Sequence, residues 1–222
     1  MSTTTASRLI TVTQPRSPVS EAYRTLRTNI QFYSLDRAVQ TLLITSAGPG
    51  EGKSTTLANV AVTFAETGRN VVLVDCDLRR PSLHTLFDVP NNTGLTTVIR
   101  EEQAIGDALV TTRVPNLRIL PSGPLPPNPS ELLGSQRMDR IIESLRDIAE
   151  IVLFDSPPMI AVTDAAVLSS KIDGVVLVVS IGKTKRDHVV RAKRLLGTVN
   201  AKVLGVVLNN VKFDGSLYRY YG

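Results

Sequence analysis

Apolar residues occur along the chain in short blocks, and the spacing of these blocks predicts a buried sheet covered by helices. Six runs are almost wholly apolar and rich in β-branched residues, at 41–45, 71–74, 117–120, 151–154, 175–179 and 203–208. Between them lie helical patterns at 53–67, 130–149, 163–170 and 185–199. Short apolar strands separated by helices are typical of a parallel sheet with both faces covered. We therefore expect a doubly wound, mostly parallel α/β domain with six or more strands.

The two ends of the chain differ from this central pattern. Residues 1–17 are rich in Ser, Thr and Pro, so we expect a flexible N-terminal lead-in. Ser20 is a candidate N-cap for a first helix that runs to about residue 33. Residues 18–212 are expected to form one domain, and residues 213–222 a tyrosine-rich C-terminal tail. The segment 81–112 gives no clear pattern.

Composition narrows the class of protein. The chain has 222 residues, 42% hydrophobic and 20% charged, as expected for a soluble globular domain with a full core. A single cysteine, Cys76, excludes an intrachain disulfide and fits a reducing, cytoplasmic setting. No run approaches the roughly 18 to 20 apolar residues of a membrane helix. The net charge is +5, but Lys and Arg are spread without basic runs, so we expect no nucleic acid partner.

The strongest local motif lies between the first apolar run and the helical pattern that follows it. It matches the Walker A pattern, with Ala47 in place of the first Gly, in the strand-to-helix context that the motif requires. Glycines let backbone N–H groups converge on phosphate oxygens, and the helix N-terminus adds a favourable dipole. Lys53 is expected to reach the β- and γ-phosphates, and the Ser54 hydroxyl to ligate Mg²⁺. The expected nucleotide-binding residues of this loop are Gly48, Pro49, Gly50, Glu51, Gly52, Lys53, Ser54 and Thr55.

Two further apolar runs end in carboxylates. The run 71–74 is followed by Asp75 and Asp77, and the run 151–154 by Asp155. Ligands of open α/β sheets bind at the carboxyl ends of the strands, where these side chains are expected. The second run matches Walker B, whose carboxylate holds Mg²⁺ directly or through water. One such Asp alone is often a turn or capping residue, but two of them downstream of a Walker A motif favour a catalytic site.

Taken in order, these motifs resemble a known family. The runs VVLVDCDLRRP, LPSGPLPPNPSELL, IVLFDSPP and GVVLNN are similar to those of the cytoplasmic kinase domain of bacterial tyrosine kinases, which serve capsule and exopolysaccharide synthesis and export. The resemblance covers roughly residues 15–222. It implies a kinase that uses ATP and Mg²⁺ and phosphorylates its own C-terminal tyrosines. It places Asp75 and Asp77 in the family's additional Walker A′ motif and Asp155 in Walker B.

The resemblance also implies partners. The family's Glu-x-x-Arg-x-x-Arg helix, which meets the neighbouring subunit of a ring, is matched by Glu21, Arg24 and Arg27. Without the resemblance, these three would be a solvated face with local ion pairs. The C-terminal tyrosine cluster is matched by Tyr218, Tyr220 and Tyr221. Further implied partners are a transmembrane activator or fused membrane domain, which would hold the chain at the inner face of the cell membrane, and a protein tyrosine phosphatase.

Catalytic roles follow from the chemistry of phosphoryl transfer, which needs charge neutralisation and positioning more than covalent help. A tyrosine hydroxyl has a pKa near 10, so a carboxylate beside it would help remove its proton. Asp77 is the candidate, with Asp75 and Asp155 nearer the metal; the resemblance implies this trio without fixing each part. Asn209 is the candidate for a hydrogen bond to adenine, with Asn210 as the alternative, although an Asn there could equally be a turn residue.

Two rival functions remain open. The first is a partitioning-type switch ATPase that hydrolyses ATP without tyrosine transfer. Such ATPases carry an additional Lys early in the loop, in the pattern K-G-G-x-G-K, but Gly48 occupies that position here. The second is a pseudo-kinase scaffold, against which the intact Lys53, Ser54 and three carboxylates argue. A GTPase lacks support because no Asn-Lys-x-Asp motif occurs, and the eukaryotic-kinase motifs are absent too.

Overall fold

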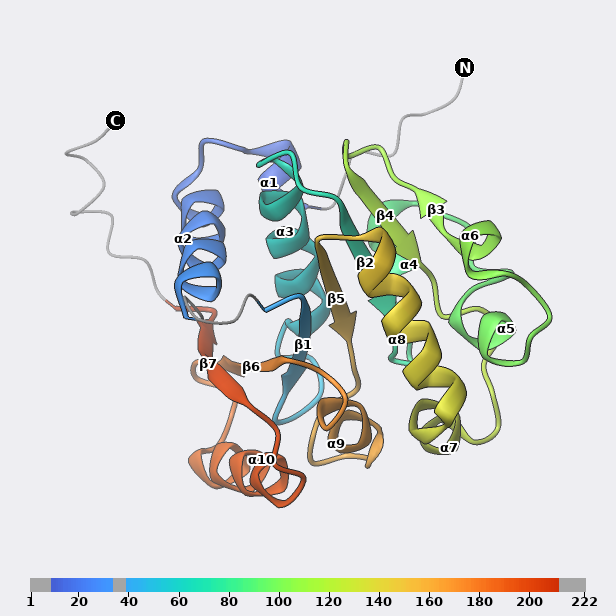
Figure 1. The fold of residues 1–222 in the computed structure, drawn as a ribbon. Helices are drawn as coiled ribbons and strands as arrows, with labels where there is room; N and C mark the ends of the chain where they lie inside the picture. The colour runs from blue at the N-terminus through green and yellow to red at the C-terminus, as the bar shows by residue number, and fades with distance from the viewer. Residues whose placement is uncertain (1–8, 34–38, 212–222) are drawn as a thin grey trace.

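The computed structural model describes residues 9–33 and 39–211, and the architecture of this part is one twisted sheet between two layers of helices (Figure 1). The strands lie in the order β3-β4-β2-β5-β1-β6-β7, and every neighbouring pair is parallel except β3 and β4. The fold class and all six predicted strands are confirmed. The strands are β1 (Thr41–Ser46), β2 (Val71–Asp75), β3 (Val110–Thr111), β4 (Leu117–Leu120), β5 (Ile151–Asp155), β6 (Gly174–Ser180) and β7 (Val203–Asn209).

Helices cover both faces of the sheet because the central strands are apolar on both sides. Successive side chains of a strand point to opposite faces; Val72 and Val74 belong to one buried cluster, whereas Val71 and Leu73 belong to the other. Helices α2, α3 and α4 cover one face, and α5 and α7 to α10 the other. The helices are α1 (Ile10–Thr13), α2 (Pro18–Phe32), α3 (Lys53–Ala65), α4 (Leu83–Phe87), α5 (Leu95–Ile99), α6 (Ile105–Ala108), α7 (Pro129–Gly134), α8 (Gln136–Ile148), α9 (Asp164–Ser169) and α10 (Arg186–Thr198).

The N-terminal segment differs from the sequence-based expectation. Residues 9–17 do not form a flexible lead-in: α1 packs against α3, and Leu9 and Thr11 are buried. Both the backbone N–H and the hydroxyl of Thr11 donate to Asn59 Oδ1, at 3.1 and 2.9 Å. The Ser/Thr composition that suggested flexibility here supplies hydrogen-bond donors to a buried amide.

The N-cap of α2 is Ser17 rather than the predicted Ser20. The Ser17 hydroxyl accepts from the Ser20 backbone N–H at 3.2 Å, and Pro18 occupies the first helical position, where a missing N–H costs nothing. Ser20 lies inside the helix, and its hydroxyl donates to the Gln14 carbonyl at 2.7 Å. The helix therefore begins three residues earlier than expected.

The predicted helix 130–149 is also wrong in one respect, because it is two helices. Ser135 has an extended backbone, with φ −69° and ψ 156°, which ends α7 and starts α8. Its hydroxyl accepts from the Met138 backbone N–H at 3.3 Å. The segment without a clear pattern, 81–112, contains three short helices and the short strand β3.

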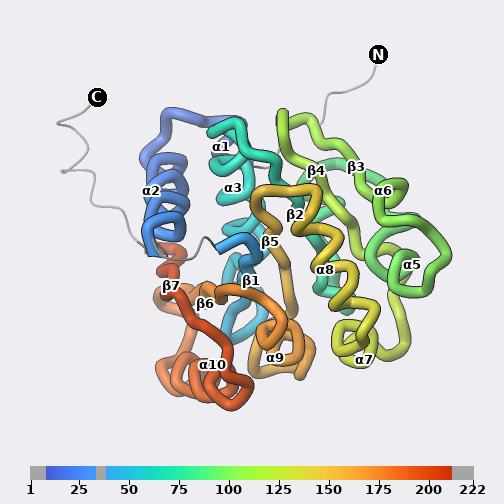
Figure 2. The backbone as a smooth tube through the Cα atoms, in the orientation of Figure 1, coloured from blue at the N-terminus to red at the C-terminus, as the bar shows by residue number. Residues whose placement is uncertain are grey.

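The parallel arrangement brings the chemically distinctive loops together. The strands β2, β5 and β1 are adjacent and parallel, so the loops that follow them lie at one edge of the sheet (Figure 2). Asp75 and Asp155 are register partners at the ends of β2 and β5. In the described ranges, no helix is long and apolar enough to cross a bilayer.

The capping of α2 gives a stability prediction. We expect Ser17→Ala to lower the free energy of unfolding by about 1 kcal/mol, because an N-cap acceptor is lost. Ser144→Ala is the matched control: this exposed hydroxyl donates to the Arg140 carbonyl of its own helix, so the change should be near neutral. Urea denaturation followed by circular dichroism measures both. Equal stabilities of the two variants would contradict the assignment of Ser17 as the cap.

Candidate functional site

The phosphate-binding loop joins β1 to α3. Two of its glycines have left-handed backbones, Gly50 with φ 68° and Gly52 with φ 90°, which a side chain would strain. Gly52 is also the N-cap of α3, and Lys53 is the first residue of that 13-residue helix. The unpaired N–H groups of its first turn and the helix dipole therefore favour an anion at the loop. This is the geometry that the sequence predicted for a phosphate site.

The loop is braced from inside by Glu51. Its carboxylate is 3% exposed and accepts from the backbone N–H groups of Ala47 and Gly48, at 3.2 and 2.9 Å. A Cβ at Gly48 would lie 3.1 Å from Glu51 Oε1, so this position has little room for a side chain. Glu51 was predicted to bind the nucleotide. Its side chain instead shapes the loop, which leaves its backbone N–H as the group that can face a phosphate.

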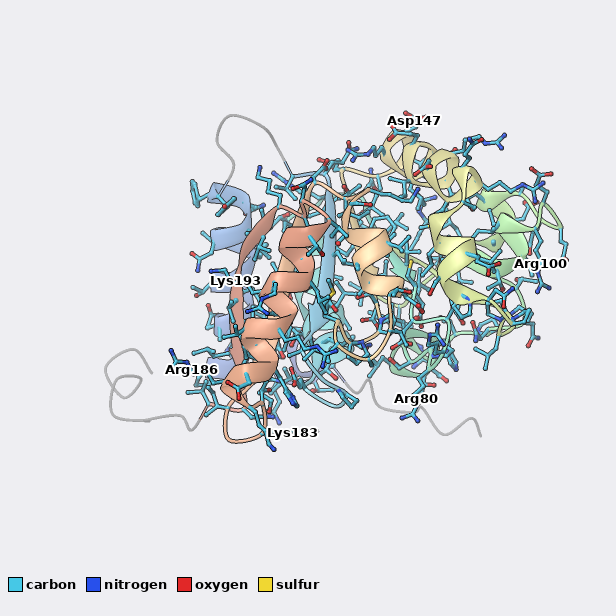
Figure 3. The ribbon with its side chains drawn as sticks, turned by 90° about the horizontal axis from the view of Figure 1, so that it is seen from below. Arg80, Arg100, Asp147, Lys183, Arg186 and Lys193 are labelled. Atoms are coloured by element: carbon cyan, nitrogen blue, oxygen red, sulfur yellow. The ribbon has the colours of Figure 1, made fainter. Side chains whose placement is uncertain are left out.

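Two residues from the far end of the chain hold the loop from outside. Lys183 Nζ donates to the Gly50 carbonyl at 2.8 Å, and Asn209 Nδ2 donates to the Glu51 carbonyl at 2.9 Å. A Cβ at Gly52 would lie 2.1 Å from Asn209 Nδ2, so the close approach requires glycine. Figure 3, viewed from below, shows Lys183 at the rim of the molecule. Sequence reasoning missed Lys183, because a lysine in a polar turn carries no signal.

Asn209 and Asn210 are distinguished by their contacts. Asn209 lies at the end of β7 against the loop, and its Oδ1 accepts from the Asn210 backbone N–H at 2.9 Å. Asn210 has a left-handed backbone with φ 58°, and its amide donates to Ser180 Oγ at 2.8 Å. Asn210 is thus a turn residue. Asn209 remains the candidate for contact with a base, through the part of its amide that these bonds leave free.

The catalytic candidates converge on the Lys53 ammonium. Lys53 Nζ lies 2.9 Å from Asp77 Oδ2 and 3.3 Å from Asp155 Oδ1, and it donates to Ser54 Oγ at 3.0 Å. Ser54 Oγ in turn donates to Asp155 Oδ2 at 2.5 Å. The side chains of Lys53, Asp77 and Asp155 are 12%, 6% and 0% exposed. Residues from the Walker A, A′ and B motifs therefore form one buried cluster.

Asp75 lies behind this cluster rather than in it. Its Oδ1 accepts from the Asp77 backbone N–H at 3.2 Å. Its Oδ2 accepts from the backbone N–H groups of Ser82 and Leu83, at 3.1 and 3.0 Å, which start α4. It makes no hydrogen bond to Lys53 in the described part of the chain. The structure thus brings Asp77, rather than Asp75, to the position beside Lys53 and Asp155; a metal-binding role for Asp75 stays a prediction.

The cluster carries excess negative charge. Burial, together with the nearby Asp155 carboxylate, raises the pKa of Asp75 to about 7. Burial also raises the pKa of Asp155, although Lys53 and the Ser54 hydrogen bond oppose this. Burial lowers the pKa of Lys53, but the carboxylates of Asp155 and Asp77 outweigh it and leave the pKa above its usual value. Two carboxylates beside one ammonium, with Asp75 behind them, favour the binding of a further cation.

These donors fit Mg²⁺ bound together with a nucleotide. Hydroxyl and carboxylate oxygens are the ligands that Mg²⁺ prefers, and it is usually held by one or two carboxylates plus phosphate oxygens. Among the described residues, no group of three or more His, Cys, Asp or Glu side chains is arranged to hold a metal unaided. Ser54 and Asp155 are the residues whose oxygens could supply the protein's share of such a site. The glycine loop supplies the cradle for the phosphates.

The predicted interface residues make contacts within the chain. Arg24 pairs with Glu21 at 2.6 Å and with Glu66, the C-cap of α3, at 3.2 Å. Arg27 Nη1 donates to the Thr63 carbonyl at 2.8 Å. Local ion pairs, the alternative interpretation, are thus present, and they attach α2 to the end of α3. The predicted acceptors Tyr218, Tyr220 and Tyr221 lie outside the described residues.

Comparison with known proteins agrees with this geometry. The ParA family model, described as NUBPL iron-transfer P-loop NTPase, matches residues 37–216. The chain is 46% identical to the tyrosine-protein kinase YwqD of Bacillus subtilis over 215 residues, which cover 96% of this chain and 91% of that protein. A nucleotide-binding P-loop fold is therefore established.

Solved structures give the same result. The chimerical protein CapA2B2 matches with a TM-score of 0.89 and 41% identity, covering 92% of this chain and 90% of that one. The kinase domain of the Escherichia coli tyrosine kinase ETK matches with a TM-score of 0.91 and 30% identity, covering 97% and 85%. The chain belongs to the ParA-like P-loop NTPases and, among them, to the family of bacterial tyrosine kinases.

Proposed function

We propose that this chain transfers the γ-phosphoryl group of ATP to the tyrosines Tyr218, Tyr220 and Tyr221 of its own C-terminal tail. The observation that carries the proposal is the position of Lys53 between Asp77 and Asp155, at the first residue of the phosphate-loop helix. An ammonium at that point faces a bound γ-phosphate, and a carboxylate beside it can accept the proton of an attacking hydroxyl.

The loop and its neighbours bind the substrate nucleotide. The backbone N–H groups of residues 50–55 cradle the phosphates, and Ser54 and Asp155 hold Mg²⁺, which neutralises phosphate charge when bound. Asp75 adds negative charge behind the metal site, and it shapes the loop after β2 by accepting the backbone N–H groups of Ser82 and Leu83. Asn209 contacts adenine from the end of β7.

Asp77 acts as the proton acceptor. A tyrosine hydroxyl with a pKa near 10 is a weak nucleophile at neutral pH, so a nearby carboxylate assists its attack. Asp77 is better placed for this role than Asp75, whose two oxygens accept backbone N–H groups. Its Oδ2 contacts Lys53 and its Oδ1 accepts from the Arg80 backbone N–H at 3.0 Å, so the carboxylate is held at the cluster from both sides.

Regulation follows from the family. We infer a homo-oligomeric ring in which one subunit's tail enters the next subunit's site, with α2 at the interface through Glu21, Arg24 and Arg27. A transmembrane activator, separate or fused, holds the kinase at the inner face of the membrane, and a protein tyrosine phosphatase reverses the reaction. Each added phosphate brings about −1.5 to −2 charges, which favours release of the tail from the carboxylate cluster. The process regulated is capsule or exopolysaccharide synthesis and export.

A switch ATPase is the second candidate, because the matched ParA family is broader than the kinases. Incubation of the purified chain with Mg-ATP, followed by mass spectrometry, separates the two. Phosphate on the C-terminal tyrosines supports the kinase. ATP hydrolysis with no phosphotyrosine would instead establish the switch ATPase.

Removal of the Lys53 charge tests the active site. We expect Lys53→Met to lower tyrosine phosphorylation by about 10³-fold or more, a loss of the size associated with a cation that faces the transferred phosphoryl group. Lys193→Met is the matched control, because Lys193 is exposed on α10 and lies apart from Lys183, the residue that contacts the loop (Figure 3). Radiolabel transfer from ATP measures both. Wild-type labelling of Lys53→Met would refute the assigned site.

Replacement of Tyr218, Tyr220 and Tyr221 by Phe tests the acceptors. Phosphotyrosine should fall to a small fraction while ATP binding stays unchanged, since only the hydroxyl nucleophiles are removed. Tyr33→Phe, which changes an exposed ring near the end of α2, is the control. Undiminished labelling of the triple variant would move the acceptor to Tyr33 or Tyr23; Tyr23 is the poorer candidate because burial raises its pKa.

The interface is tested by Glu21, Arg24 and Arg27 changed together to Ala. We expect the ring to dissociate, and light scattering measures the molar mass. Because Arg24 also pairs with Glu66 inside the chain, Glu66→Gln serves as the control: it breaks that pair without changing α2. Dissociation in the triple variant alone supports an interface. Equal masses for the triple variant and the parent would exclude it.

A further inference from the structure

A second ion pair, with a buried carboxylate, lies beside the proposed catalytic cluster. Asp164, the first residue of α9, has a fully buried side chain. Arg79, from the loop after β2, donates two hydrogen bonds to this carboxylate: Nε lies 2.8 Å from Oδ2 and Nη2 lies 3.0 Å from Oδ1. A bidentate pair of this kind fixes orientation as well as distance. It joins the loop of Asp77 to the segment that follows Asp155.

Ser130 adds a third segment to this pair. Its hydroxyl donates to Asp164 Oδ1 and lies 3.0 Å from Thr163 Oγ1. Ser130 belongs to α7, directly after the Pro-rich run LPSGPLPPNP, which has no part in the chemistry described above. Burial raises the pKa of Asp164, but the hydrogen bonds from Arg79 and Ser130 outweigh burial and hold the pKa below its usual value. Asp164 is therefore an ionised anchor shared by three segments.

Opposite charges alternate from this anchor to the phosphate loop. Asp164 binds Arg79, whose positive charge also interacts with Asp77. Asp77 binds Lys53, and Lys53 lies 3.3 Å from Asp155. Arg80, the residue after Arg79, donates its backbone N–H to Asp77, and its own side chain projects outward (Figure 3). Movement of Arg79 would therefore shift the loop that presents Asp77 to Lys53.

We propose that Asp164 is a positioning residue for phosphoryl transfer: by gripping Arg79, and with Ser130, it fixes the loop that carries Asp77 against Lys53. This inference rests on the proposed function, in which Asp77 accepts the tyrosine proton. It gives the motif around residues 121–130 a mechanical role, because Ser130 connects that motif to the anchor. Asp164 touches neither substrate nor the reacting atoms.

The chain contains a closely matched pair that serves as the control. Arg146 also binds Asp173 in a bidentate way, through its two terminal nitrogens, with Nη2 to Oδ1 at 2.8 Å and Nη1 to Oδ2 at 3.1 Å. Asp173 also accepts from the backbone N–H groups of Gln40 and Thr41, at the opposite end of β1 from the phosphate loop. Asp173→Asn therefore weakens a comparable ion pair remote from the site.

The test compares Asp164→Asn, Arg79→Lys and Asp173→Asn with the parent chain, all well below their melting temperatures. We expect Asp164→Asn and Arg79→Lys to lower the rate constant of tyrosine phosphorylation by about tenfold to a hundredfold, as a small misplacement of a reacting group does. The dissociation constant of ATP should change by less than about twofold, because uniform nucleotide binding is retained. Asp173→Asn should lower the melting temperature and leave the rate constant unchanged.

A double-variant cycle with Asp77→Asn decides whether Asp164 acts through Asp77. If it does, Asp164→Asn has little further effect once Asp77 is changed, because the two effects share one cause. The inference would be overturned if the rate losses of Asp164→Asn and Asp77→Asn multiply in the double variant. Equal rates for the Asp164→Asn and Asp173→Asn variants would also overturn it. Should Asp164→Asn fail to fold, Arg79→Lys completes the cycle, since Arg79 is 42% exposed. A full rate for Asp77→Asn alone would reject the role of Asp77 in the proposed function instead.

Discussion

The contact between the Lys53 ammonium and the carboxylates of Asp77 and Asp155 is the interaction on which the rest of the site depends. Parallel pairing of β2 with β5 makes Asp75 and Asp155 register partners at a buried edge, and Asp77 follows two residues later. Unpaired charges in such a place are strongly unfavourable. Lys53 pairs with the carboxylates of Asp77 and Asp155, and backbone N–H groups donate hydrogen bonds to Asp75. A bound cation, together with an anionic nucleotide, would neutralise the negative charge that remains.

The order of strands explains why these charges meet. Strand β1 lies between β5 and β6, so the phosphate loop emerges beside the Walker B carboxylate and beside the turn that carries Lys183. Strand β7 is next to β6 and delivers Asn209 to the same loop. Two segments from the C-terminal part of the chain thus hold one short loop. A loop fixed in this way keeps its N–H groups aligned before a nucleotide arrives, which lowers the cost of binding.

Local patterns predicted much of this arrangement, and contacts between distant residues account for what they missed. Six strands follow from apolar runs, and Lys53 and Asp155 follow from motifs whose strand-to-loop context is local. The brace from Glu51 and the pair of Arg79 with Asp164, 85 residues apart, depend on side-chain directions that no periodicity encodes. The sequence pattern also predicts one helix over 130–149 where the structure has two, because it does not show where the chain turns. Ser135 breaks a continuous amphipathic pattern because the chain must turn there, and its hydroxyl then caps the next helix.

The phosphate loop itself separates this kinase from the switch ATPases that share its fold. Their pattern places a second lysine at the position of Gly48. Here a Cβ at Gly48 would lie 3.1 Å from the Glu51 carboxylate, which already accepts the Gly48 N–H. A side chain at this position would require the Glu51 carboxylate to shift, so a lysine there would disturb the contact by which Glu51 braces the loop. The loop keeps a single ammonium, Lys53, within its own phosphate cradle. Positive charge beyond it comes from Lys183, which binds the outer carbonyl of Gly50.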